Sequence, residues 1–306
     1  MFPAFLTTIL YSISIVCATR SAKLLGGTEA NFWRITLATV FLAIWAHVFG
    51  QGMGGDSFPL FFWSGVVGVG ADVFLFQGLP RLGSRLSSLL VQCGSALAVA
   101  ALEWLWLGTT LTAPQMIACC TILLGGVIAL TPGEHLSFSR NQWVFGIAFC
   151  VLAALGNGFG AVLSRKAFAI AAAAHQSIDG GTAGYQRLLG GLLVAAISIL
   201  LVKRREVLAQ VTDNDAPRIP SKEKWKRAWM WVFFNSLAGQ TLGVSCFQWA
   251  LKTTPTGLVM ALVSTTPLVI IPFAWKFEGD KAHRRSIIGG AIAVAGAVAL
   301  VLVARR

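Results

Sequence analysis

Ten long apolar runs follow one another along the chain, each bounded by charged residues, glycine or proline. Each run holds 16 to 23 residues, enough for a helix to cross a hydrocarbon core about 30 Å thick. Strands of a transmembrane barrel would be shorter and would alternate strictly between apolar and polar residues. The sequence therefore predicts an all-α integral membrane protein with ten transmembrane helices, covering approximately residues 4–19, 30–49, 59–79, 86–107, 114–131, 143–163, 184–202, 228–250, 256–277 and 286–304.

Composition supports a membrane protein and excludes several other classes. Apolar residues make up 56% of the 306 residues and charged residues only 12%, about half the charged share of a soluble domain. The net charge of +12 lies almost wholly between the apolar runs, which suits contact with anionic lipid headgroups. No patch of interleaved basic and aromatic residues typical of a nucleic-acid reader occurs. We therefore expect membrane lipids as partners and no nucleic acid.

The chain also repeats itself. A shift of 171 residues aligns residues 62–130 with residues 233–301 without a gap. Chance similarity between apolar helices is the alternative, but the gapless register favours a duplication, so we expect two copies of a five-span unit. Identical residues at paired positions include Phe62/Phe233, Gly68/Gly239, Phe76/Phe247, Gln77/Gln248, Leu97/Leu268, Trp104/Trp275, Gly108/Gly279 and Gly125/Gly296.

An odd number of spans in each copy forces the second copy to cross the membrane in the opposite sense. The loop charges agree: in the first copy, Lys and Arg follow the first and third spans. In the second copy, most of them follow the second and fourth spans. Inverted repeats are a common plan of secondary transporters, with the substrate site near mid-membrane between the copies. The predicted units are residues 1–133 and residues 134–306, the latter with a basic loop at 203–227.

Two stretches near the ends of the copies resemble a known family. In Gly83–Leu130, an apolar helix ends in Leu107-Gly108, and a short polar turn then leads to Ile122–Gly126. The stretch Gly257–Val301, with Glu278-Gly279, has the same pattern. The pattern resembles the drug/metabolite transporter superfamily, and within it the EamA-like ten-helix branch. The resemblance covers nearly the whole chain and specifies fold and transport much better than substrate.

An arginine early in the second span of each copy, Arg34 and Arg187, adds to this resemblance. One departure is Thr109, which stands where the second copy's pattern would have an acidic residue beside its glycine. The resemblance implies a ten-helix transporter of small organic metabolites, often an exporter of amino acids or related solutes. It also implies cytoplasmic termini.

The charge distribution points to the opposite orientation. Loops after odd-numbered spans hold 17 of the 24 Lys and Arg residues, and loops after even-numbered spans together with the C-terminus hold five. The positive-inside rule therefore places the odd-numbered loops in the cytoplasm and both termini outside. The two interpretations conflict, and the charge count is the one we favour.

Three charged residues inside the spans are candidates for function. Asp72 lies midway along the third span, where a carboxylate costs about 2.5–3.5 kcal/mol on insertion scales, so it should face a cavity or a partner. It is either a proton-coupling or cation-binding group, or part of a structural hydrogen bond between helices. Arg34 and Arg187 lie about one turn inside their spans. They either extend to the headgroups or flank the path and hold a substrate carboxylate.

Amide and aromatic side chains complete the predicted substrate path. Buried amides in a membrane must find hydrogen-bond partners, so each either lines a path or bridges helices. Tyrosine and tryptophan can shape a pocket or anchor a helix at the interface. The residues assigned to the path, besides the three charged ones, are Gln77, Asn157, Gln240, Gln248, Tyr11, Trp33 and Tyr185.

Small residues and prolines predict where helices pack closely or bend. Gly156 with Gly160, and Gly239 with Gly243, form small-xxx-small faces that we expect to bring spans 6 and 8 together. The prolines Pro267 and Pro272 are expected to kink the ninth span.

Signatures of enzymes, metal sites and cofactor sites are missing. The sequence has no HExxH, GxSxG or P-loop motif, and its histidines and six cysteines lack metal-ligand spacing. We therefore expect no cofactor, no metal and no enzymatic activity. The expected function is gradient-driven transport of a small-molecule substrate across the plasma or inner membrane, through a cavity formed mainly by spans 1, 3, 4, 6, 8 and 9. A membrane enzyme acting on a lipid-linked substrate and a non-transporting scaffold are the alternatives. No sequence feature distinguishes a monomer from an oligomer.

Overall fold

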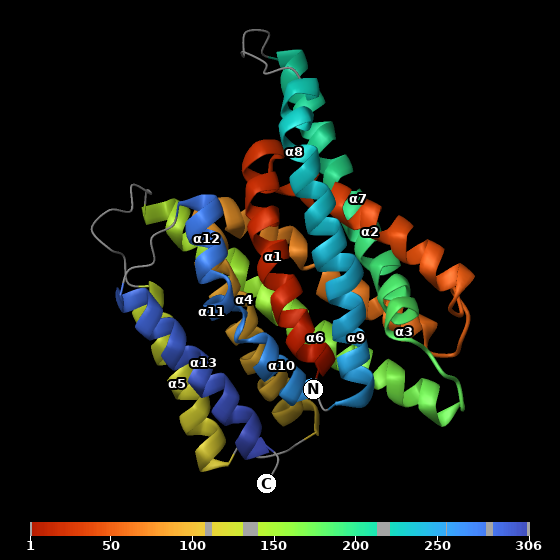
Figure 1. The fold of residues 1–306 in the computed structure, drawn as a ribbon. Coiled ribbons are helices and arrows are strands. Elements are labelled where there is room, and N and C mark those ends of the chain that lie inside the picture. Colours follow the sequence, from red (N-terminus) through yellow and green to blue (C-terminus); the bar gives the residue numbers. More distant parts are fainter. Residues whose placement is uncertain are drawn as a thin grey trace.

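Helices and the turns that join them build the part of the chain that the structure describes, residues 2–107, 112–130, 140–212, 221–254, 256–279 and 284–304 of a computed structural model (Figure 1). The Gly108 and Thr109 positions of the family pattern lie outside these residues. In chain order the elements are α1 (Phe2–Leu25), α2 (Gly27–Val48), α3 (Phe58–Ser64), the π-helix η1 (Gly65–Val69), α4 (Asp72–Leu107), α5 (Ala113–Leu130), α6 (Arg140–Ala173), α7 (Gly180–Thr212), α8 (Ser221–Asn235), the π-helix η2 (Ser236–Gly243), α9 (Val244–Thr253), α10 (Thr256–Val263), α11 (Thr266–Val269), α12 (Ile271–Glu278) and α13 (Arg284–Ala304).

The expected membrane character is confirmed. Five described segments are long and apolar enough to cross a bilayer: Phe2–Leu25, Gly27–Val48, Phe58–Val99, Asn141–Ala173 and Gly180–Arg204. The count of ten spans is confirmed only in part. The segment Phe58–Val99 contains two expected spans, and the expected spans 228–250 and 256–277 are each divided into shorter helices. The start of α1 and the end of α13 lie at one end of the molecule, opposite the end of α7 and the start of α8 (Figure 1).

The duplication is visible in an irregular turn that both copies share. The π-helix η1 begins at Gly65 and η2 begins at Ser236, which are related by the same shift of 171 residues that aligns the sequences. In η1 the amide of Gly70 donates to the carbonyl oxygen of Gly65, five residues earlier, at 2.9 Å. A rare backbone geometry at equivalent positions supports the repeat independently of residue identity.

The packing of the helices shows that one copy is inverted relative to the other. The first helix of each copy packs against the other copy: α1 lies on α8, η2 and α9, and α6 lies on α3, η1 and α4. The second helices, α2 and α7, pair with each other, as do the last helices, α5 and α13, which stand beside the main bundle (Figure 1). The equivalent helices α5 and α13 run antiparallel, since Gly125 lies against Ala293 and Gly289 against Ala129. A pseudo-twofold axis in the membrane plane produces this arrangement.

Glycines allow helices of the two copies to pack closely, although not the helices that we expected. A Cβ atom added at Gly160 of α6 would lie 2.7 Å from the Cα atom of Gly68 in η1. A Cβ atom at Gly243 of η2 would lie 2.8 Å from the Tyr11 ring in α1. The prediction that spans 6 and 8 meet through their glycine faces is therefore wrong, because the twofold packs each face against a helix of the other copy.

Helix α1 is rich in hydroxyl side chains and yet buried. Its Thr7, Thr8, Ser12 and Thr19 each donate to the carbonyl oxygen four residues earlier, at 2.8–3.1 Å. These bonds satisfy the hydroxyl groups without water, so a polar helix can occupy the centre of the bundle. The small side chains also let η2 approach α1 closely.

The expected kinks in the ninth span are confirmed. The span is divided into α10, α11 and α12, with Pro267 in the first turn of α11 and Pro272 in the first turn of α12. A proline is tolerated in a first helical turn because the N–H group that it lacks would have no partner there. The divided span places Met260 and Val263 against the central cavity described below.

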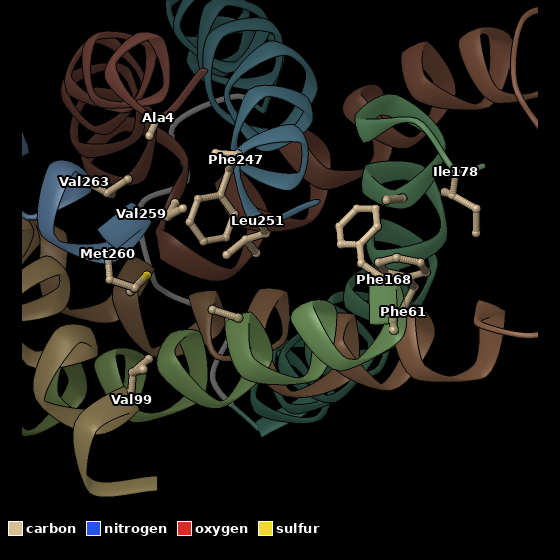
Figure 2. Close-up of a cluster of buried hydrophobic side chains, with 14 of the residues drawn as sticks. Ala4, Phe61, Val99, Phe168, Ile178, Phe247, Leu251, Val259, Met260 and Val263 are labelled. Carbon is tan, nitrogen blue, oxygen red and sulfur yellow. The ribbon is translucent and has the colours of Figure 1, made fainter. Parts of the chain in front are cut away.

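An apolar cluster lies between that cavity and the end of the molecule where α1 begins. Figure 2 shows its members, which include Phe247 and Leu251 of α9, Met260 of α10 and Ala4 of α1. Phe247 and Met260 also line the cavity, and Leu251 lies one turn further along α9. The cluster therefore closes the cavity on this side with packed side chains from both copies.

Candidate functional site

A cavity of about 90 Å³ lies between the two copies. A space of this volume holds several water molecules or a small organic group. Spans 1, 3, 4, 6, 8 and 9 line it as expected, and spans 2 and 7 also contribute, each through an arginine. The polar residues that line it are Tyr11, Ser14, Arg34, Asp72, Gln92, Ser95, Asn157, Arg187 and Gln240.

A cap at the start of α7 fixes the helix that carries Arg187. The carboxylate of Asp179 accepts from the backbone N–H groups of Gly181 and Thr182 at 2.8 and 3.0 Å, and from Trp45 of α2 at 3.0 Å. Burial alone would raise the pKa of Asp179, but these bonds and one from the Thr182 hydroxyl hold it below its ordinary value. Asp179 therefore stays ionised at neutral pH and ties α7 to α2.

The two arginine backbones meet the opposite copy at equivalent points. The Ser236 hydroxyl of η2 donates to the carbonyl oxygen of Arg34 at 2.6 Å. At the equivalent point in the first copy, Gly65 of η1 lies so close to the carbonyl oxygen of Arg187 that an added Cβ atom would overlap it. The π-helices thus hold both arginines at the interface between the copies.

Asp72 and Arg34 form a buried ion pair at the cavity wall. The Arg34 Nη2 atom lies 2.6 Å from Asp72 Oδ2, and the two side chains are 5% and 8% exposed. Gln240 donates to the same carboxylate oxygen at 3.2 Å, and Asn157 approaches Oδ1 at 3.5 Å. Arg34 also donates to Asn31 and stacks on the Phe76 ring, 4.5 Å from its centroid. These contacts satisfy both charges, which burial otherwise makes costly.

Arg187 has the same aromatic neighbour but no equivalent acceptors. Its Cζ atom lies 5.9 Å from the centroid of Phe247, the repeat partner of Phe76. Asp72 pairs with Gly243 in the register of 171 residues. Asn31, three residues before Arg34, corresponds to Gly184, three residues before Arg187, so the second copy supplies neither acceptor. Arg187 is 4% exposed, and its Nε and Nη1 atoms have no hydrogen-bond partner among the described residues.

Four of the ten path residues predicted from the sequence lie away from the cavity. Trp33 packs on Trp225, Gln77 donates to Thr28, Tyr185 contacts His47, and Gln248 donates to Ser164. Each lies one or two positions from a cavity residue, and a helix turns about 100° per residue, so these side chains point elsewhere. These four do not line the cavity, and their place on a substrate path stays a prediction. The other six, Tyr11, Arg34, Asp72, Asn157, Arg187 and Gln240, all line the cavity.

Several residues of the cavity wall were not predicted from the sequence. Phe76 and Phe247 lie under the two arginines, and Ser14, Gln92 and Ser95 add polar atoms. The repeat held a signal for the first two, because Phe76-Gln77 and Phe247-Gln248 are identical pairs. The glutamines were assigned to the substrate path, whereas the phenylalanines are the ones that line the cavity.

The cavity chemistry suits an organic solute. Among the described residues, no group of three or more His, Cys, Asp or Glu side chains is placed to hold a metal ion. The wall offers hydroxyl, amide and guanidinium groups beside three aromatic rings, those of Tyr11, Phe76 and Phe247. Such a wall can bind a small molecule through a few polar contacts and apolar packing.

Comparisons with known proteins agree with this architecture. The model of the EamA-like transporter family matches residues 1–131 and again residues 144–302. None of the curated proteins compared with the chain matches it. A solved structure titled only "Crystal structure of protein" is similar to the chain in fold, with a TM-score of 0.60 at 16% identity, over 99% of this chain and 96% of that one. Because the family model matches nearly the whole chain in two repeats, the protein belongs to the EamA-like transporter family.

Proposed function

We propose that the protein is a secondary transporter that exports a small organic metabolite, an amino acid or a related polar solute, by alternating access of the central cavity. The observation that carries this proposal is the polar cavity between two inverted copies, lined by Asp72, Arg34 and Arg187. In inverted-repeat transporters the substrate binds at such an interface, and one copy rocks against the other. The sequence holds no P-loop, so a solute or proton gradient supplies the energy.

The Asp72–Arg34 pair is the element through which we propose that a gradient acts. Asp72 is the one carboxylate among the described residues lining the cavity. When a proton or cation binds Asp72, the bond between Asp72 and Arg34 weakens. The Arg34 side chain of α2 is then released from α4. Because α2 also contacts η2 of the other copy, a change at this pair can bias the packing between the copies.

A metabolite screen followed by counterflow tests the function. Cells with and without the protein are compared for retained and released metabolites, and each solute that differs is measured in proteoliposomes of the purified protein. We expect saturable counterflow for at least one solute and none in protein-free liposomes. Chemical conversion of a lipid-linked substrate, or no flux with any solute that the screen returns, would contradict transport and support an enzyme or a scaffold.

A further inference from the structure

The guanidinium of Arg187 is a buried charge to which the described residues give no hydrogen-bonded counter-charge. Its Nε and Nη1 atoms are buried without an acceptor, and the side chain borders the cavity. The third nitrogen, Nη2, lies so close to Gly68 that an added Cβ atom there would overlap it. A buried cation without a hydrogen-bonded counter-charge is strongly disfavoured, so this position is expected to be filled by a ligand when the protein works.

The first copy shows what a satisfied arginine looks like in this fold. Arg34 lies over Phe76, donates to Asp72 at 2.6 Å and to Asn31 at 2.9 Å. The second copy keeps the arginine and the phenylalanine and replaces both acceptors by Gly243 and Gly184. The space beside Arg187 therefore lacks the carboxylate that its twin has.

The charge balance of the cavity gives the sign and the size of the charge that the missing group carries. Arg34 and Asp72 neutralise each other in their ion pair. Arg187 is the only other Arg, Lys, Asp or Glu among the described residues of the wall. The cavity thus carries one net positive charge, which a singly charged anion balances and a doubly charged phosphate ester does not.

We propose that Arg187 binds the carboxylate of the transported solute, and that the solute is a monocarboxylate whose apolar part lies against Phe247 and Met260. This inference rests on the proposed transport function and narrows its solute to a monocarboxylate, since the zwitterion of a neutral amino acid carries no net charge. Phe247 stacks near the guanidinium and Met260 lines the same cavity, so an apolar chain attached to the carboxylate meets apolar side chains. The buried guanidinium then donates to the carboxylate in place of the absent acidic residue.

Binding to the purified full-length protein in detergent tests the site separately from transport. The probes are 3-phenylpropionate and its amide, which have nearly the same shape and differ in charge. We expect the carboxylate to raise the melting temperature with concentration and the amide to leave it unchanged. Arg187→Gln should bind the carboxylate about 10- to 100-fold more weakly, because a charge-assisted hydrogen bond is lost. The affinity of Arg187→Lys for the carboxylate should lie between those of the wild type and Arg187→Gln.

The matched control is Arg284→Gln, which removes an exposed arginine at the start of α13 and should bind like the wild type. Equal stabilisation by carboxylate and amide, or undiminished binding in Arg187→Gln, overturns the proposal. So does equal stabilisation by chloride alone, which would make the site one for an inorganic anion. If Arg187→Gln does not fold, Arg187→Lys is used for the test. When Arg187→Lys binds 3-phenylpropionate as tightly as the wild type, in buffer with little chloride to compete, a specific guanidinium site is contradicted.

Two outcomes separate this inference from the proposed function. Saturable flux of a solute without an anionic group, unaffected by Arg187→Gln, would overturn the carboxylate site and leave transport standing. Carboxylate binding that depends on Arg187, in a protein that moves no solute, would support the site and overturn transport.

Discussion

Asp72→Asn is expected to abolish counterflow and to destabilise the protein by about 3–5 kcal/mol, the usual cost of removing one partner from a buried ion pair. Asparagine keeps the shape of the side chain, but leaves Arg34 as a second uncompensated cation at the cavity wall. It also removes the charged acceptor of Gln240. Counterflow in proteoliposomes and the thermal melting of the purified variant measure the two effects.

A second substitution separates the structural and functional parts of this loss. In Asp72→Asn combined with Arg34→Gln both charges are gone, so much of the lost stability should return while transport stays absent. Asp56→Asn is the matched control, because Asp56 is exposed in the α2–α3 connection and bonds to Gln176. Undiminished flux in Asp72→Asn would remove Asp72 from the mechanism.

Gly65→Ala should be among the most damaging single substitutions in the chain. An added Cβ atom would overlap the carbonyl oxygen of Arg187, which is backbone and cannot turn aside. The interface between η1 and α7 must then separate, for which about 3 kcal/mol is a reasonable cost of overpacking. We expect a melting temperature several degrees lower and reduced flux, since Arg187 moves with α7.

Gly126→Ala provides the control for this experiment. An added Cβ atom at Gly126 of α5 meets nothing within 4 Å, so alanine there should be neutral or slightly stabilising through its better helix propensity. If Gly65→Ala melts like Gly126→Ala, then η1 and α7 are not in the close contact that holds Arg187.

The fold could be predicted from the sequence because bilayer thickness and duplication leave strong patterns. The length of the apolar runs gave the helices, and the identical residues at Phe62/Phe233 and beyond gave the repeat. The odd number of spans then required an inversion, which the antiparallel packing of the equivalent helices α5 and α13 shows. The interruptions η1 and η2 had no signal that we could read, since their residues are compatible with an ordinary helix.

The site was predicted less well, because periodicity does not fix how a membrane helix is rotated against its neighbours. Polar residues within a span were easy to find, and charged ones such as Asp72 were rightly expected to face a cavity or a partner. Gln77 and Gln248 do not line the cavity, because their neighbours Phe76 and Phe247 face it instead. The pairing of Asp72 with Arg34 joins two helices and depends on tertiary packing alone.

The accessibility of the cavity from each side of the membrane tests the central claim most directly. Gln92 lines the cavity and is partly exposed, so Gln92→Cys in a protein whose six native cysteines are replaced offers one thiol at the proposed path. A protein that retains only Cys120, exposed on α5 away from the cavity, is the control. We predict that a membrane-impermeant thiol reagent labels Cys at 92 from either side, that a transported solute protects it, and that Cys120 stays unlabelled. A thiol at 92 that reacts from neither side in a protein with measured flux would show that solutes cross elsewhere.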